Sequence, residues 1–154
     1  MTLSSQGNVV VLNSEIDTSK EITWEDYGFL QPYVLSQELI FYNKGICAKR
    51  HKIPIPKHRF IVNGQEKEFQ EIPIFDMELL KGANGVYLHL YGANYCCGEK
   101  CPEFNGLYLL DGTIVSECLS TMNSPLNGKE ISEIDIDLSK SIRKKSIFYL
   151  FDPL

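Results

Sequence analysis

The segment Leu107–Cys118, LYLLDGTIVSEC, shows most directly what kind of fold this chain adopts. Two runs of β-favouring side chains flank the pair Asp111-Gly112, which is typical of a tight hairpin turn because glycine tolerates a positive φ. In the expected register Leu109 faces Ile114, so apolar side chains meet across the two strands. The segment therefore predicts an antiparallel β-hairpin.

A second hairpin is predicted at His58–Phe69, where the pair Asn63-Gly64 supplies the turn. In that register Arg59 lies opposite Glu68, and opposite charges stabilise a cross-strand pair. Further segments have the composition or the alternation of strands and complete the expected sheet: Val86–Tyr91, residues 133–138 and Ser146–Phe151.

The N-terminal third of the chain has a different pattern, which favours helices. Thr23 is a suitable N-cap for a short helix, with Glu25 and Asp26 in its first turn. A second helix is expected from Pro32, a residue favoured at the first helical position, to Gly45, which would end it.

The second helix depends on the recurrence of Leu35, Leu39 and Tyr42 at helical spacing. The competing interpretation is a strand over Glu38–Tyr42, because its aromatic and β-branched residues favour extended structure. We prefer the helix, and we also expect one or two helical turns at Asp76–Leu80.

Together these patterns predict an α+β fold, a mostly antiparallel sheet built from hairpins with one or two short helices from the N-terminal third packed on one face. Residues 1–20 are rich in Ser, Thr, Asn and Gln around the run Val9–Leu12, and they are expected to form a flexible arm with one edge strand at residues 8–13. Residues 21–154 are expected to form a single globular domain, the usual size for one core.

The composition of the 154 residues excludes several classes of protein. Hydrophobic residues make up 44% and charged residues 23%, so the chain can bury a core and is not intrinsically disordered. Its purest aliphatic run, Val9–Leu12, is too short to span a bilayer or to form the core of a signal peptide. With an odd number of cysteines as well, we expect a reducing, cytoplasmic setting.

Cysteine residues form the most unusual local pattern of the sequence. Cys96 and Cys97 are adjacent, and Cys97 and Cys101 have a spacing that zinc ligands use. Cys118 and His89, or Cys96 in place of His89, could complete a set of four ligands. The second closely spaced pair of a structural zinc site is missing, so we predict no metal or other cofactor and keep zinc as an alternative.

Enzymatic activity is not expected from the sequence. The histidines His51, His58 and His89 could each act as a base for a cysteine nucleophile, but no local signature of a cysteine or serine hydrolase surrounds any cysteine or serine of the chain. A small metal-binding or cysteine-dependent enzyme that uses the loop Cys96–Cys101 is therefore the alternative rather than the prediction.

Charge is distributed in blocks along the chain. The net charge is −5, which disfavours general nucleic-acid binding, whereas residues 43–59 contain six basic side chains and no acidic one. A nucleic-acid-binding domain that uses residues 44–59 is a second alternative. No membrane partner is expected.

The acidic residues point to a protein partner instead. Glu133, Asp135 and Asp137 alternate, so a strand there would present all three carboxylates on one face. The remaining candidates lie near the N-terminus: Glu15, Asp17, Glu25 and Asp26. Because an acidic surface accelerates association with a basic protein, we predict a non-catalytic bacterial immunity protein or antitoxin that neutralises a basic toxin, such as a nuclease, by direct binding.

Overall fold

The computed structural model describes residues 1–24, 29–62, 64–82, 85–93, 102–121, 124–129, 134, 136 and 141–146. All regular structure in these residues is β-strand. The strands are β1 (Thr2–Ser5), β2 (Asn8–Trp24), β3 (Phe29–Asn43), β4 (Ile46–Lys52), β5 (Lys57–Val62), β6 (Gln65–Gln70), β7 (Ile74–Gly82), β8 (Gly85–Ala93), β9 (Glu103–Leu109), β10 (Ile114–Leu119), β11 (Asn127–Gly128) and β12 (Ser141–Ser146). The described part of the chain contains no helix that could cross a membrane.

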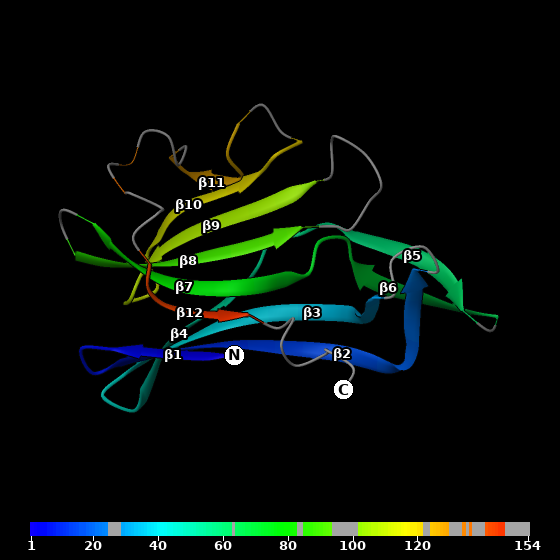
Figure 1. The fold of residues 1–154 in the computed structure, drawn as a ribbon, viewed down its shortest axis with the longest axis horizontal. Helices are drawn as coiled ribbons and strands as arrows, with labels where there is room; N and C mark the ends of the chain where they lie inside the picture. Colours follow the sequence, from blue (N-terminus) through cyan, green and yellow to red (C-terminus); the bar gives the residue numbers. More distant parts are fainter. Residues whose placement is uncertain are drawn as a thin grey trace.

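The strands form two main antiparallel sheets and one separate hairpin (Figure 1). The four-stranded sheet has the order β1-β2-β3-β4, and the six-stranded sheet has the order β11-β10-β9-β8-β7-β12. The hairpin of β5 and β6 lies at one end of the molecule. Most neighbours in the sheets are also neighbours in the sequence, as expected for a chain of hairpins.

The hydrophobic core lies between the two main sheets. Leu12, Leu39 and Phe41 come from the four-stranded sheet, and Leu90 and Phe104 come from the six-stranded sheet, each at most 1% exposed. Two sheets that bury one face each against the other form a β-sandwich. We call the face of each sheet that is turned toward the other its inner face.

Polar contacts also join the sheets along both edges. On one side Arg143 of β12 donates a hydrogen bond from Nη1 to the carbonyl oxygen of Ser4 in β1, at 3.1 Å. On the other side His51 of β4 lies against Glu117 of β10, with 2.5 Å between Nε2 and Oε1. The relative position of the sheets is therefore held at both edges as well as by the core.

The expected α+β fold is wrong, because the described residues are all-β. The predicted helix from Pro32 to Gly45 is strand β3, and the helical turns predicted at Asp76–Leu80 lie within strand β7. In β3 the neighbours Ile40 and Phe41 are both buried, and in β7 Leu79 and Leu80 are both buried. A strand that is covered on both faces loses its alternation of apolar and polar residues, so its pattern can resemble that of a helix.

The N-terminal residues are also arranged differently from the expectation. The edge strand predicted at residues 8–13 is part of β2, an interior strand that pairs with β1 and β3. Leu3 and Val10 contribute to the core. Of the helix predicted to begin at Thr23, Thr23 and Trp24 are in β2, whereas Glu25 and Asp26 lie outside the described residues.

The predicted strand over residues 133–138 is not seen where the structure describes it. Ile134 and Ile136 lie in no strand, and the backbone N–H of Ile136 donates to the carbonyl oxygen of Ile134 at 2.8 Å, a tight bend. The strand predicted at Ser146–Phe151 is described only at Ser146, the last residue of β12.

Both predicted hairpins are confirmed. In the first, Arg59 pairs with Glu68 in register, and their side chains form an ion pair at 2.9 Å. In the second, β9 and β10 are antiparallel, but Ile114 pairs with Tyr108 rather than with Leu109, and a bulge follows Ile114. The strand predicted at Val86–Tyr91 is confirmed as part of β8.

Candidate functional site

Four polar side chains meet between the sheets where β4 lies near β10. We call them the inter-sheet cluster: His51, Tyr108, Glu117 and Asn127. Leu119 points into the core, so Glu117, two residues earlier on the same strand, also points inward. Its register partner is Gly106, and a Cβ atom at that glycine would lie 2.7 Å from Tyr108 Oη, so the missing side chain leaves room for the phenol.

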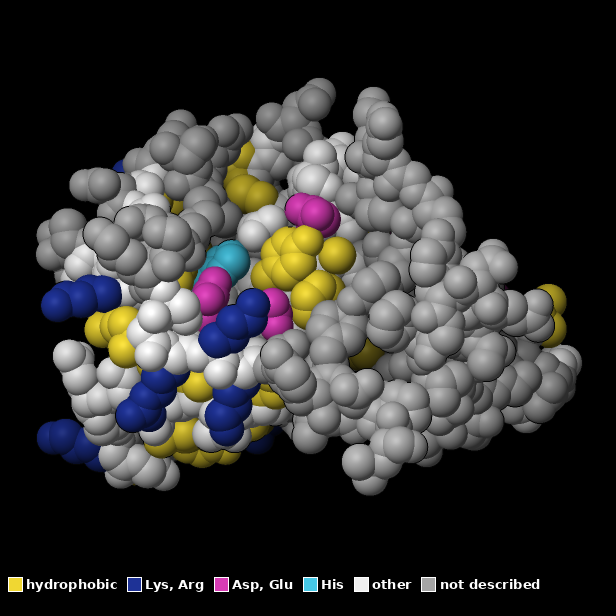
Figure 2. Space-filling model, viewed as in Figure 1, with side chains coloured by type: hydrophobic (Ala, Val, Ile, Leu, Met, Phe, Trp, Pro, Cys, Tyr) yellow, Lys and Arg dark blue, Asp and Glu magenta, His cyan; other side chains and the backbone are white. Residues whose placement is uncertain are grey.

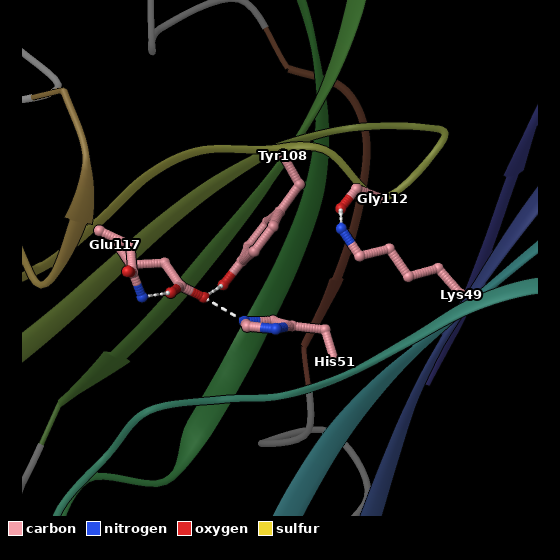
Figure 3. Close-up of polar contacts among 6 residues, drawn as sticks. Lys49, His51, Tyr108, Gly112 and Glu117 are labelled. Atoms are coloured by element: carbon pink, nitrogen blue, oxygen red, sulfur yellow. Dashed lines mark hydrogen bonds and ion pairs between the residues drawn. The ribbon is translucent and has the colours of Figure 1, made fainter.

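The Glu117 carboxylate accepts hydrogen bonds on both oxygens (Figure 3). Oε1 accepts from Tyr108 Oη at 2.6 Å and lies 2.5 Å from His51 Nε2, which donates when that nitrogen carries the proton. Oε2 accepts from Asn127 Nδ2 at 2.8 Å. The Glu117 side chain is 0% exposed, so these three groups replace the water that a carboxylate normally binds.

Burial and hydrogen bonding have opposite effects on the pKa of Glu117. Burial by itself raises the pKa, but the hydrogen bonds from His51, Tyr108 and Asn127 together lower it below the ordinary value. The pKa of Tyr108 is raised well above its ordinary value by burial, by the nearby Glu117 charge and by the hydrogen bond to Glu117. The carboxylate is therefore ionised and the phenol protonated near neutral pH.

The cluster ties β4, β9 and β11 to one carboxylate of β10 and so stabilises the junction of the sheets. Each oxygen of Glu117 already accepts from the protein, and the phenol that could act as an acid is held by the same carboxylate. Nearby, Lys49 Nζ donates to the carbonyl oxygen of Gly112 at 2.7 Å and joins β4 to the β9–β10 turn (Figure 3).

A second polar group lies on the outer face of the six-stranded sheet. We call it the outer-face row: Glu78 of β7, His89 of β8 and Asn105 of β9. Glu78 Oε1 lies 2.8 Å from His89 Nδ1, and Asn105 Oδ1 lies 3.1 Å from His89 Nε2. Figure 2 shows acidic and histidine side chains beside a hydrophobic patch over the middle of this sheet.

Both ring nitrogens of His89 have a partner within the outer-face row. A histidine that accepts a proton from a cysteine needs one nitrogen directed at the sulfur. Here Nδ1 faces a carboxylate and Nε2 faces an amide oxygen, and the His89 side chain is 9% exposed. The row connects three adjacent strands and does not form a cysteine–histidine pair.

The predicted zinc ligands are only partly described. Cys97 and Cys101, together with Cys96, lie outside the described residues. Cys118 lies on β10, two strands away from His89 on β8, and its sulfur contacts Ser116 Oγ at 3.3 Å. Within the described ranges, no group of three or more His, Cys, Asp or Glu side chains could hold a metal ion.

Most of the predicted partner-binding acids also lie outside the described residues: Glu25, Asp26, Glu133, Asp135 and Asp137. The two that are described, Glu15 and Asp17, lie on β2. The Glu15 side chain is exposed and accepts a hydrogen bond from Ser36 Oγ at 3.1 Å. The structure thus places two of the acids on the same strand.

The basic residues of the segment 44–59 are brought together more clearly. They line β4 and the beginning of β5, and nearly all of this segment outside Ile53–Ile55 is exposed. Arg50 forms an ion pair with Glu38 at 2.9 Å. Lys44, Lys52 and Lys57 form no ion pair or hydrogen bond with any side chain that the structure describes. Strand β4 is thus an exposed, basic edge of the four-stranded sheet.

Sequence reasoning missed the inter-sheet cluster and the outer-face row. One signal was present for the cluster: Glu117 occupies a position of the predicted hairpin strand that alternation places on the same face as Leu119. A carboxylate on the apolar face of a strand needs donors, and Tyr108 lies in the same predicted hairpin. The other two donors come from β4 and β11, whose approach the sequence does not reveal. Comparison of the chain with protein-family models, with curated proteins and with solved structures finds no match.

Proposed function

We propose that this protein is a non-catalytic binding protein that recognises another protein, and that its specific role is that of an immunity protein or antitoxin acting on a basic toxin. The observation that supports a binding role most is the state of the buried titratable side chains. His51 and Glu117 bond to each other, as do Glu78 and His89, so these groups contribute to stability instead of standing ready for a substrate.

The basic character of the proposed partner rests on charge. The chain has a net charge of −5, and an opposite charge on the partner raises the rate of encounter. Exposed acidic side chains in general contribute little to folding, and Glu15 is exposed. Glu133, Asp135 and Asp137, with Glu15 and Asp17, are the side chains that we assign to this contact.

The test begins with the tagged protein as bait in an extract of its source organism, and then measures the purified partner directly. We expect the partner to be basic, to lose its toxic activity when bound, and to associate more slowly as salt rises. Reversing Glu133, Asp135 and Asp137 to lysine is expected to slow association about tenfold or more.

A matched control distinguishes the effect of where these charges lie from the effect of net charge alone on the association rate. Reversing Glu66, Glu68 and Glu71 to lysine makes the same change in net charge at the separate hairpin and just after it. A control variant that slows association as much would show that only net charge matters. If the partner binds both variants at the rate of the unchanged protein, the proposed contact is wrong.

The two alternative functions have direct tests as well. One equivalent of zinc in the purified protein would favour a metal-binding or cysteine-dependent role for the loop Cys96–Cys101. Salt-sensitive retention on heparin would favour nucleic-acid binding through residues 44–59, because such binding releases counterions.

A further inference from the structure

Strand β4 forms one edge of the four-stranded sheet, and its register shows which backbone groups point away from the sheet. The N–H of Ile53 donates to the carbonyl oxygen of Gln37 at 3.3 Å. Hydrogen-bonded pairs alternate along an antiparallel ladder, so His51 bonds to β3, whereas the N–H and C=O groups of Arg50 and Lys52 point outward. Another strand could pair with these groups.

Most residues of this edge strand are exposed, although Lys49 and His51 direct their side chains to the other sheet. Every residue of β4 is exposed except His51, which is half-buried. Even the small residue Ala48 is exposed, which shows that the backbone near it is accessible. The opposite edge strand, β1, is different, because Leu3 is buried in the core and Ser4 accepts a hydrogen bond from Arg143 of β12.

The side chains along β4 determine what can pair with it. Arg50 and Lys52 project from the outer face of the sheet, where Glu38 forms an ion pair with Arg50, and the side chain of Arg50 is 59% exposed. Lys49 precedes Arg50 on the strand, and Lys44 and Lys57 flank the strand. Cations on an edge strand repel a second copy of the same strand, which protects against aggregation, but they attract an acidic one.

We propose that β4 binds an extended acidic segment of another protein, which adds to the four-stranded sheet as a further strand beside Arg50 and Lys52. Backbone hydrogen bonds would supply affinity, and acidic side chains at alternate positions would face Arg50 and Lys52. This inference goes beyond the function proposed above, because it concerns another surface and a partner segment of the opposite charge.

The probe is a fluorescent peptide as long as β4, with blocked ends and alternating glutamate and valine, and binding is measured by anisotropy. We expect it to bind the unchanged protein and to protect the amides of Arg50 and Lys52 from hydrogen exchange. A peptide with lysine in place of glutamate is expected not to bind, since it meets like charges.

Two variants at one position separate strand addition from charge attraction. Lys52→Ala and Lys52→Pro both remove the charge, but only proline also removes the outward N–H, and it leaves the β3–β4 ladder intact. We expect Lys52→Pro to bind the peptide about tenfold more weakly than Lys52→Ala does. Lys81→Ala, which removes an exposed charge from β7, is expected to bind like the unchanged protein.

A modified peptide repeats the test without altering the protein, in case Lys52→Pro does not fold. Methylating alternate backbone nitrogens of the peptide blocks its pairing edge and leaves its charge unchanged, so we expect binding to be lost. The proposal is overturned if the methylated and unmethylated peptides bind equally, if Lys52→Pro and Lys52→Ala bind equally, or if the glutamate peptide does not bind. It is also overturned if a single-stranded oligonucleotide binds β4 more tightly than the peptide, because the edge would then serve nucleic acid.

Discussion

At the scale of single residues, the turn between β9 and β10 shows why glycine is required at one position. Leu109 N donates to Thr113 O at 2.9 Å, and Gly112 N donates to Leu109 O at 3.0 Å, so the loop has three residues. Asp111 Oδ1 accepts from Thr113 N at 2.8 Å. Gly112 ends the loop at a φ of 87°, a left-handed conformation that side chains with a Cβ atom disfavour.

We expect Gly112→Val to destabilise the protein by about 2 kcal/mol or more, because strain at positive φ combines with steric overlap. A Cβ atom there would lie 2.8 Å from Lys49 Cδ and 3.0 Å from Phe41 Cδ2. Gly45→Val is the matched control, since Gly45 has a φ of 81° and nothing within 4 Å of a Cβ atom. Urea unfolding should show a smaller loss of stability for the control variant. Equal losses of stability in the two variants would contradict a contribution from steric overlap.

The variant Glu117→Gln tests the inter-sheet cluster. We expect it to lower the free energy of unfolding by about 1–3 kcal/mol at neutral pH, because charged acceptors form stronger hydrogen bonds than neutral ones. The pKa of Glu117 in the folded protein lies below its ordinary value of 4.5, so the unfolded chain takes up the proton first as the pH falls. Its stabilising contribution is therefore complete above pH 4.5 and is lost as the pH falls below that value through the pKa of the folded state.

The stability difference between the Glu117→Gln variant and the unchanged protein should accordingly shrink in acid. Urea unfolding at neutral pH and at several values below pH 4.5 measures this difference. Glu66→Gln is the control, because Glu66 is exposed on β6 and forms an ion pair with Arg59 at the long distance of 3.7 Å. A difference that stays constant with pH would show that Glu117 does not titrate as the cluster requires.

At the scale of elements, a pair of buried glutamines ties the beginning of β7 to β3. Gln37 Nε2 donates to Ser14 Oγ and to Ile74 O, both at 2.9 Å, and Gln37 Oε1 accepts from Ile74 N at 2.7 Å. Gln70 Nε2 donates to Gln37 Oε1 at 2.7 Å. The Gln37 side chain belongs to the four-stranded sheet and satisfies the backbone N–H and C=O of Ile74, at the start of a strand of the six-stranded sheet. These bonds therefore position the two sheets relative to each other.

We expect Gln37→Leu to cost about 2–3 kcal/mol, because it leaves the N–H and C=O of Ile74 buried without partners. Gln70→Leu should lower the free energy of unfolding by less than Gln37→Leu does. The double variant should lose less than the sum of the two single losses, since each single change already removes the hydrogen bond between the glutamines. Urea unfolding of the three variants measures these changes, with Gln65→Leu at an exposed position of β6 as a neutral control. Strict additivity would show that the two side chains do not act together.

At the scale of the whole molecule, the N-terminal strand takes part in closing the sandwich. The α-amino group of Met1 donates to Leu12 O at 2.7 Å, and Leu3 is 4% exposed. β1 covers the edge of β2 and receives a hydrogen bond from β12 of the other sheet at Ser4. Its removal therefore affects the sheet edge, the core and the contact between the sheets together.

We expect deletion of residues 1–5 to lower stability by about 3 kcal/mol or more, because it removes a buried leucine and exposes an unpaired edge of β2. The melting temperature should fall, and the truncated protein should aggregate more readily. The double substitution Thr2→Ala and Ser4→Ala changes only exposed side chains and is expected to be nearly neutral. An unchanged melting temperature after the deletion would indicate that the N-terminal segment is the loose arm that its composition predicts.

The sequence by itself determined the local features of this protein. Asn63-Gly64 and Asp111-Gly112 mark real turns, Arg59 and Glu68 pair as expected, and Val86–Tyr91 is a strand. Each of these depends on residues a few positions apart, where turn conformation and cross-strand pairing are decided by the residues themselves.

Only the tertiary structure decided that β3 and β7 are strands and that Glu117 meets His51. Ile40 and Phe41 are both buried, as are Leu79 and Leu80, because neighbours that are distant in the sequence cover both faces of these strands. The candidate site has the same origin: Glu117 and Tyr108 share a hairpin, but His51 arrives from a strand of the other sheet. Burial is a property of the assembled molecule, so a pattern of apolar residues cannot show which faces will be covered.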